Sequence, residues 1–96
     1  SDEHILKTVA SFYNVQLADL VGRSRKKEMV EPRQVTMYLL RDILRMSYPY
    51  IGEKLGRDHT TVIHSFEKIN HEINNNSPFN QKILLIKEAL YNGNKQ

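Results

Sequence analysis

The run Gly56-Arg57-Asp58-His59-Thr60-Thr61-Val62-Ile63-His64 holds the side chains of this chain that are best suited to reading nucleic acid. A glycine turn is followed by short polar residues, and an apolar pattern of helical spacing begins directly behind them: Val62, Phe66, Ile69 and Ile73. This spacing predicts a helix from residue 59 to about residue 75 with one face in a core. Polar groups then lie at the N-terminal tip of a docked helix. A helix-turn-helix uses this layout to present its second helix to the major groove of DNA.

Each polar residue of this tip has a use in DNA recognition. Asp58 can accept a hydrogen bond from cytosine N4, and it can equally cap the helix by accepting from the N–H of Thr60 or Thr61. Neutral His59 offers one donor and one acceptor, and Thr60 combines a methyl group with a hydroxyl, so both can contact base edges. Thr61, one step around the helix, is placed for a phosphate near the free N–H groups of the helix start. Together these residues favour DNA readout.

Positive charge is concentrated ahead of this run. The chain has 14 Lys and Arg against 11 Asp and Glu, a net charge of +3. Residues 23–45 hold only three acids, and their bases are Arg23, Arg25, Lys26, Lys27, Arg33, Arg41 and Arg45. A local positive field is typical of a surface that binds a polyanion. A solvated loop followed by an ordinary charged helix face would give the same count, so charge alone leaves both interpretations open.

The totals restrict the class of protein. Ninety-six residues suffice for one small helical core, so we expect a single domain over residues 1–96. The absence of cysteine excludes disulfides and thiolate metal sites and fits a cytoplasmic location. No run approaches the roughly 18 apolar residues of a membrane span, so no membrane partner is expected. The chain does not begin with methionine, and we expect it to be a fragment of a longer, multidomain protein.

Apolar residues recur at helical spacing along nearly the whole chain, which predicts an all-α domain of about six helices. The first helix is expected to end near residue 14. The later helices are expected to cover residues 17–21, 32–47, 49–55, 59–75 and 79–92. The polar, basic segment 22–31 lacks periodicity and is expected to be a loop. Pro32 suits the first turn of a helix, and Gly56 suits the end of one. The residues expected to face inward in the first and third of these helices are Ile5, Val9, Phe12, Val35, Leu39, Ile43 and Met46.

Two other function classes are less well supported. His64, Glu67 and His71 lie near one helix face, but the His-Glu-x-x-His arrangement of a zinc enzyme is absent, so a solvated polar face is the preferred interpretation and no metal is expected. There is no Gly-x-Ser-x-Gly motif, cysteine nucleophile or phosphate-binding Gly-rich loop. A helix-turn-helix that only docks proteins is the alternative, and it would need an exposed apolar or aromatic centre.

The chain resembles, over essentially its whole length, the C-terminal DNA-binding domains of the DnaA family of bacterial replication initiators. The resemblance rests on Pro32-Arg33-Gln34, Ile51-Gly52-Glu53-Lys54-Leu55, the run 56–64, and Glu67-Lys68-Ile69 behind it. It implies a Trp-repressor-like helix-turn-helix with an upstream basic loop. It also implies binding of non-palindromic DnaA boxes of TTATCCACA type in double-stranded DNA at the replication origin, with a monomer on each site.

The resemblance assigns roles to individual residues. Asp58, His59 and Thr60 would read base edges in the major groove, and Arg25 would enter the adjacent minor groove. Phosphate contacts would come from Arg33, Gln34, Arg41, Tyr48, Pro49, Arg57 and Thr61. No cofactor is expected in this fragment, because the ATPase of the family lies in an upstream domain, and regulatory proteins are implied as further partners.

Two features depart from the family pattern. Many members carry two glycines before the arginine of the turn, whereas here Gly56 stands alone, so the turn is one residue shorter. The bases of the loop are also spaced differently from the commonest pattern. The minor-groove role can therefore fall on Arg23 instead of Arg25.

Overall fold

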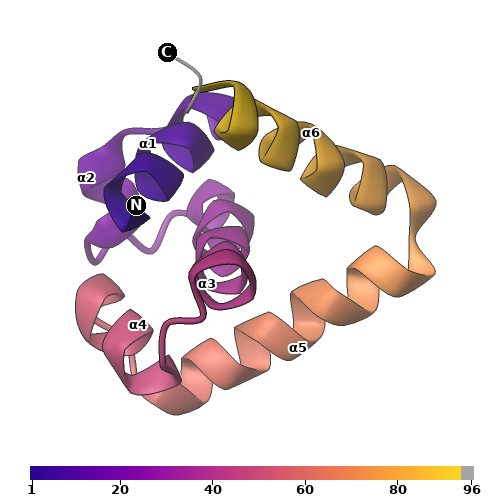
Figure 1. The fold of residues 1–96 in the computed structure, drawn as a ribbon. Helices are drawn as coiled ribbons and strands as arrows, with labels where there is room; N and C mark the ends of the chain where they lie inside the picture. The colour runs from indigo at the N-terminus through magenta and orange to yellow at the C-terminus, as the bar shows by residue number, and fades with distance from the viewer. Residues whose placement is uncertain (94–96) are drawn as a thin grey trace.

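The computed structural model describes residues 1–93, which are helical and contain no strand (Figure 1). The elements are α1 (Asp2–Tyr13), α2 (Leu17–Val21), a short 3-10 helix η1 (Lys27–Met29), α3 (Val30–Leu44), α4 (Tyr48–Leu55), α5 (His59–Asn75) and α6 (Ser77–Gly93). The prediction of an all-α domain of about six helices is confirmed. No helix within these residues has both the length and the apolar character needed to cross a membrane.

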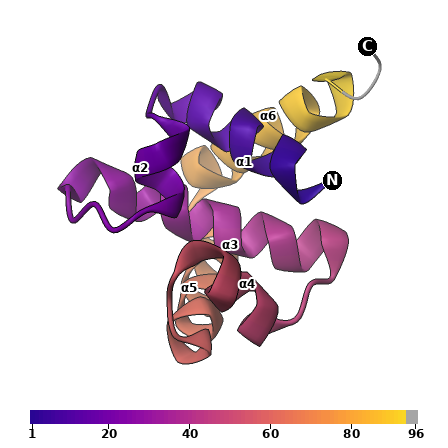
Figure 2. The ribbon, with the colours of Figure 1, turned by 90° about the vertical axis from the view of Figure 1, so that its left-hand side faces the viewer.

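Helix α3 lies at the centre of the fold, with α1 and α6 on one side of it and α4 and α5 on the other (Figure 2). Residues 35–40 are therefore buried on every face of the helix. A polar side chain at such a position needs an internal partner. The hydroxyl of Thr36 has one, because it donates to the carbonyl of Pro32 at 2.8 Å.

The limits of α3 differ from the prediction of residues 32–47. The helix begins at Val30, directly after η1, and ends at Leu44, where Arg45 adopts the left-handed conformation with φ 57°. Met29 in η1 is buried, so part of the expected loop is anchored in the core. Ile43 is 44% exposed and the inward orientation predicted for it was wrong, because α3 has left the core by that point.

The inward face of α1 was also predicted partly wrongly. Its buried residues are Ile5, Leu6, Val9 and Ala10. The next position on this face is Tyr13, which is half-buried against the core. Phe12 lies one step around the helix and is 40% exposed, and its ring makes an edge-to-face contact with Tyr13 at 5.4 Å between ring centroids.

A polar network joins α1, α3 and α6. The Tyr13 hydroxyl donates to Glu31 at 2.6 Å, and the Lys82 ammonium donates to the same carboxylate oxygen at 2.9 Å. Burial by itself would raise the pKa of Glu31, but the hydrogen bonds from Tyr13 and Lys82 lower it overall. Burial and the adjacent carboxylate raise the pKa of Tyr13, so its hydroxyl stays a donor. This network fixes the start of α3 against both terminal helices.

Candidate nucleic-acid interface

The turn between α4 and α5 consists of three residues, Gly56, Arg57 and Asp58. Gly56 has φ 65° and ends α4 in the left-handed conformation, and the Arg57 N–H donates to the Gly52 carbonyl at 2.8 Å. A Cβ on Gly52 would collide with the carbonyl oxygen of Arg57, so glycine at 52 lets the chain fold back closely over α4. Helix-turn-helix motifs join their two helices by a turn of three or four residues that often contains glycine. Here the single glycine of the turn is enough to form it.

The polar tip of α5 is exposed at all four predicted positions, 58–61. The Asp58 carboxylate caps the helix, since its Oδ1 accepts from the Thr60 N–H at 3.2 Å. The same oxygen lies 3.1 Å from Nδ1 of His59. When Nδ1 donates to Asp58, Nε2 is left for a contact to a base edge. The cap interpretation of Asp58 is thus confirmed, while its base-reading role stays a prediction.

The opposite face of α5 is fixed in the core. Val62 and Ile69 are buried, and the Phe66 ring stacks on Tyr38 with ring centroids 5.1 Å apart. Aromatic stacking and apolar burial on one face hold the helix so that its first turn projects from the domain. His64, Glu67 and His71 are exposed, and no group of three metal-binding side chains is present among residues 1–93.

The basic loop lies directly against the helix-turn-helix. The Arg57 guanidinium donates from Nη1 to the Gly22 carbonyl at 3.0 Å and to the Leu55 carbonyl at 2.6 Å. Arg23 and Arg25, the two candidates for the minor groove, are both exposed. A cavity of about 320 Å³ between loop and turn has no acidic residue in its lining, which consists of Arg23, Ser24, Arg25, Arg33, Gly56 and Arg57. The structure thus brings the basic loop against the turn that leads into the recognition tip.

Arg33 has a different environment from the one expected of a phosphate contact. Arg33 is only 9% exposed, and all three of its guanidinium nitrogens donate to backbone carbonyls. Burial, together with the nearby charge of Arg57, lowers the pKa of Arg33, although an arginine stays protonated at neutral pH. In this structure Arg33 is an internal donor to α2 and to the basic loop, and its predicted phosphate contact stays a prediction.

Three other predicted phosphate residues meet at one depression. Gln34, Arg57 and Thr61 line a hollow of about 170 Å³ between α3 and the start of α5, and Arg33 lines it too. Arg57 and Gln34 are half-buried and Thr61 is exposed. Two helices and the turn therefore supply groups to one patch beside the tip.

The remaining predicted phosphate residues form a separate group at the α3–α4 connection. The Arg41 guanidinium carbon lies 4.5 Å from the ring centroid of Tyr48, and Nη1 donates to the Met46 carbonyl at 3.1 Å. Ser47 caps α4 by accepting from the Tyr50 N–H at 3.2 Å, and Pro49 beside it is exposed. This corner holds Arg41 in place through its ring contact and its carbonyl contact.

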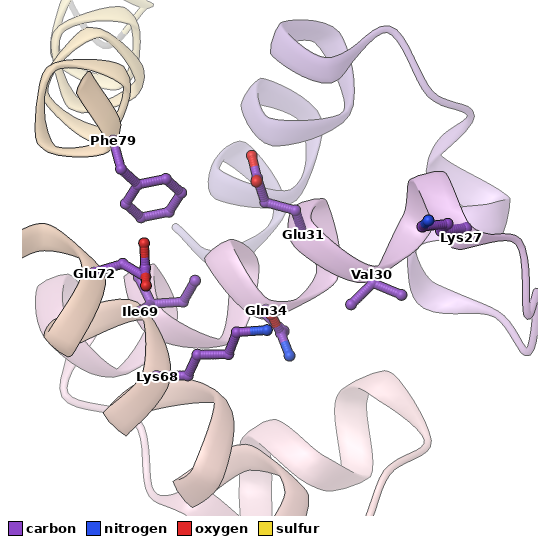
Figure 3. Close-up of a pocket in the computed structure, with 8 residues that line it drawn as sticks. All are labelled: Lys27, Val30, Glu31, Gln34, Lys68, Ile69, Glu72 and Phe79. Carbon is purple, nitrogen blue, oxygen red and sulfur yellow. The ribbon is translucent and has the colours of Figure 1, made fainter. Parts of the chain in front are cut away.

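A larger pocket of about 340 Å³ lies between η1, α3, α5 and the start of α6 (Figure 3). Its lining residues are Lys27, Val30, Glu31, Gln34, Lys68, Ile69, Glu72 and Phe79. Lys68 was not predicted as a site residue, but it stands two helical turns after Thr61 and is exposed. The spacing of seven residues, which places both on one face of α5, is the sequence signal that could have included it.

Comparisons with known proteins agree with this geometry. The family described as "Bacterial dnaA protein helix-turn-helix" matches residues 3–69. The chain is 42% identical over 86 residues to the chromosomal replication initiator protein DnaA of Thermoanaerobacter sp. (strain X514), covering 90% of this chain and 19% of that protein. It is 47% identical over 91 residues to the chromosomal replication initiator protein DnaA of Roseiflexus castenholzii, and this match covers 94% of this chain and 19% of that protein. The chain therefore spans about a fifth of the length of the relatives it matches.

Proposed function

Because the chain belongs to the bacterial DnaA helix-turn-helix family, we propose that it binds double-stranded DNA at DnaA boxes of TTATCCACA type in the chromosomal replication origin. In this proposal the first turn of α5 enters the major groove, where Asp58, His59 and Thr60 contact base edges. An arginine of the basic loop, Arg25 or its neighbour Arg23, enters the adjacent minor groove.

One observation carries the proposal: the turn that leads into the exposed polar tip of α5 is bonded to the loop that carries the exposed arginines. The bond from Arg57 to the Gly22 carbonyl makes this connection. A reader of two neighbouring grooves needs such a connection, because the grooves are displaced from each other along the duplex. The protein-docking alternative gains no comparable support, since the tip of α5 carries no large apolar side chain among its exposed residues 58–61.

Affinity and sequence preference come from different residues in this account. Phosphate contacts by Gln34, Arg41, Arg57, Thr61 and the α4 start would release counterions, so that log K falls with log salt at a slope of roughly −0.9 per neutralised phosphate. Each good base contact would supply about 1–3 kcal/mol of discrimination. A minor-groove arginine would add preference for a narrow A·T-rich groove.

A mobility shift with a duplex containing one box, measured against a scrambled duplex of the same composition, tests this proposal. We expect the box duplex to be retained in the presence of excess random competitor and to bind one copy of the chain. Equal binding to both duplexes would leave a nonspecific binder, and no binding to either would favour the protein-docking alternative. Either result would reject box recognition.

The chain covers only a fifth of its relatives, so we further propose that it is one helix-turn-helix domain of a longer initiator. ATP binding and hydrolysis would then belong to an upstream part of that protein. Under the same proposal the working location is the bacterial cytoplasm, at the nucleoid, and regulatory proteins can approach the domain there.

A further inference from the structure

Arg33 attaches two segments of the chain to α3. Its Nε donates to the Leu20 carbonyl at 3.1 Å and Nη2 donates to the Asp19 carbonyl at 2.8 Å, both in α2. Its Nη1 donates to the Ser24 carbonyl, inside the basic loop, at 3.1 Å. The planar guanidinium can satisfy three acceptors in fixed directions at once, which a lysine ammonium on a flexible stem cannot reproduce.

Arg57 attaches the same loop to the other side. It reaches the Gly22 carbonyl from the turn before α5. The loop is thus bonded at Gly22 and at Ser24, the residues that flank Arg23 and precede Arg25. We propose that Arg33 and Arg57 form a brace that holds the basic loop in register with the tip of α5, and that minor-groove selectivity depends on this brace.

The proposal rests on the proposed DNA-binding function and specifies how the two readers act together. An arginine on a free loop would lose conformational entropy when it enters the groove, and this loss would reduce both affinity and selectivity. A loop that is already bonded to α3 and to the turn avoids most of that cost. Arg33 and Arg57 are then positioning residues for the minor-groove arginine, and Arg33 is not a phosphate contact.

The first test is made without DNA, on the 96-residue chain carrying Arg33→Lys. This change keeps the charge and removes the three-carbonyl fork. Arg45→Lys is the matched control, because Arg45 is exposed and its side chain makes no hydrogen bond or ion pair within residues 1–93. We expect NMR order parameters of the Ser24 and Arg25 amides to lie near about 0.8 in the wild type and in the control, and to fall below about 0.6 in Arg33→Lys. A loop that is already mobile in the wild type, or unchanged in Arg33→Lys, would overturn the brace.

The second test is a double-mutant cycle on the box duplex. Arg25→Ala and Arg23→Ala are first compared in the wild type, and the one that costs more affinity for the box identifies the reader. This alanine variant should weaken binding about tenfold in the wild type but less than about threefold in Arg33→Lys, because the released loop has already lost its positioned reader. The salt slope should stay the same in Arg33→Lys. Equal losses in the two backgrounds would overturn the proposal. The proposal would also be overturned if Arg33→Met lowered the affinity for box and scrambled duplexes equally and reduced the slope of log K against log salt by about one, since this result identifies a phosphate contact.

A second variant protects the test against misfolding. Arg57 is half-buried, and Arg57→Lys removes the bonds to Gly22 and Leu55 while keeping the charge. It should give the same loss of loop order and the same non-additivity with the alanine variant of the reader, Arg25 or Arg23. If the wild type fails to prefer the box duplex, the proposed function is rejected and the reading role of the loop with it. The order parameters measured without DNA then still decide separately whether the brace exists.

Discussion

His59 is the residue at which base reading and phosphate binding separate most clearly. Its side chain is 58% exposed, and within residues 1–93 its one close polar contact is to the cap residue Asp58. Truncating it therefore leaves the fold of α5 and the basic loop in place. Asp58 is less suited to this purpose, because its loss would also remove a helix cap worth about 1 kcal/mol.

For His59→Ala we expect the ratio of box to scrambled affinity to fall about five- to tenfold, with the slope of log K against log salt unchanged. Fluorescence anisotropy titrations at several salt concentrations measure both quantities. Thr61→Val serves as the comparison, because Thr61 is proposed to contact a phosphate and not a base. It should lower the affinity for the box duplex and the scrambled duplex equally. An equal weakening of both duplexes by His59→Ala would mean that another residue reads the base.

At the scale of elements, the helix-turn-helix depends on two glycines for different reasons. Gly52 has no space for a Cβ because the Arg57 carbonyl occupies that position, whereas Gly56 has open space but a φ of 65°. We expect Gly52→Ala to lower the free energy of unfolding by about 2 kcal/mol or more and Gly56→Ala by about 1 kcal/mol. Urea unfolding measures both.

Asparagine separates the two causes. It tolerates the left-handed conformation, so Gly56→Asn should recover most of the stability lost in Gly56→Ala. Gly52→Asn should be at least as harmful as Gly52→Ala, because the collision with the turn is steric. Recovery at position 52 by asparagine would show that conformation, and not space, limits that site.

The network around Glu31 gives a second prediction at this scale, on pH. The pKa of Glu31 is lowered in the folded chain from an ordinary value of 4.5, so the folded state binds this proton less readily than the unfolded state does. Its stabilisation is therefore fully present above about pH 5 and is lost as the pH falls through the lowered pKa.

Glu31→Gln should consequently lower the free energy of unfolding by about 1 kcal/mol at pH 7, a modest value because the carboxylate is partly exposed. The difference from the wild type should shrink as the pH falls below 4. Urea titrations at pH 7, 5 and 3 measure this, and Glu28→Gln, which alters an exposed acid of η1, serves as control. A difference that stays constant down to pH 3 would show that packing, and not the charge, is responsible.

At the scale of the whole molecule, two separate groups of residues are proposed to contact the phosphates of one duplex. Arg41 belongs to the α3–α4 corner, a group separate from the cavity that Arg57 lines. If both groups contact phosphates of one site, removing Arg41 should lower the salt slope by about one and weaken box and scrambled duplexes equally. Arg41→Ala compared with Arg41→Lys, titrated over a range of salt, makes this measurement. An unchanged slope in Arg41→Ala would restrict the interface to the loop and the start of α5.

Much of the fold was predictable from local patterns. The apolar spacing along α5, the cap at Asp58 and the stop at Gly56 indicated where α4 ends and where α5 begins and ends, because these signals act within one or two turns. Helix α6 begins at Ser77, two residues before the predicted start. The errors concern the ends of helices and the edges of their buried faces. Val35 and Leu39 are buried as predicted, but Ile43 and Phe12 lie at the edge of the core, and the anchoring of Met29 in the core started α3 two residues earlier than Pro32 indicated.

The sequence by itself determined the residue types at the recognition tip, the helical class of the domain and its family, because each depends on local spacing or on a matching run of residues. Only the tertiary structure decided what Arg33 does. Its acceptors are backbone carbonyls of Asp19, Leu20 and Ser24, and every residue carries such a carbonyl, so no sequence pattern distinguishes a buried donor from an arginine that faces solvent. The direction of a side chain is set by which segments fold against it, and that information lies in the packing of the whole chain.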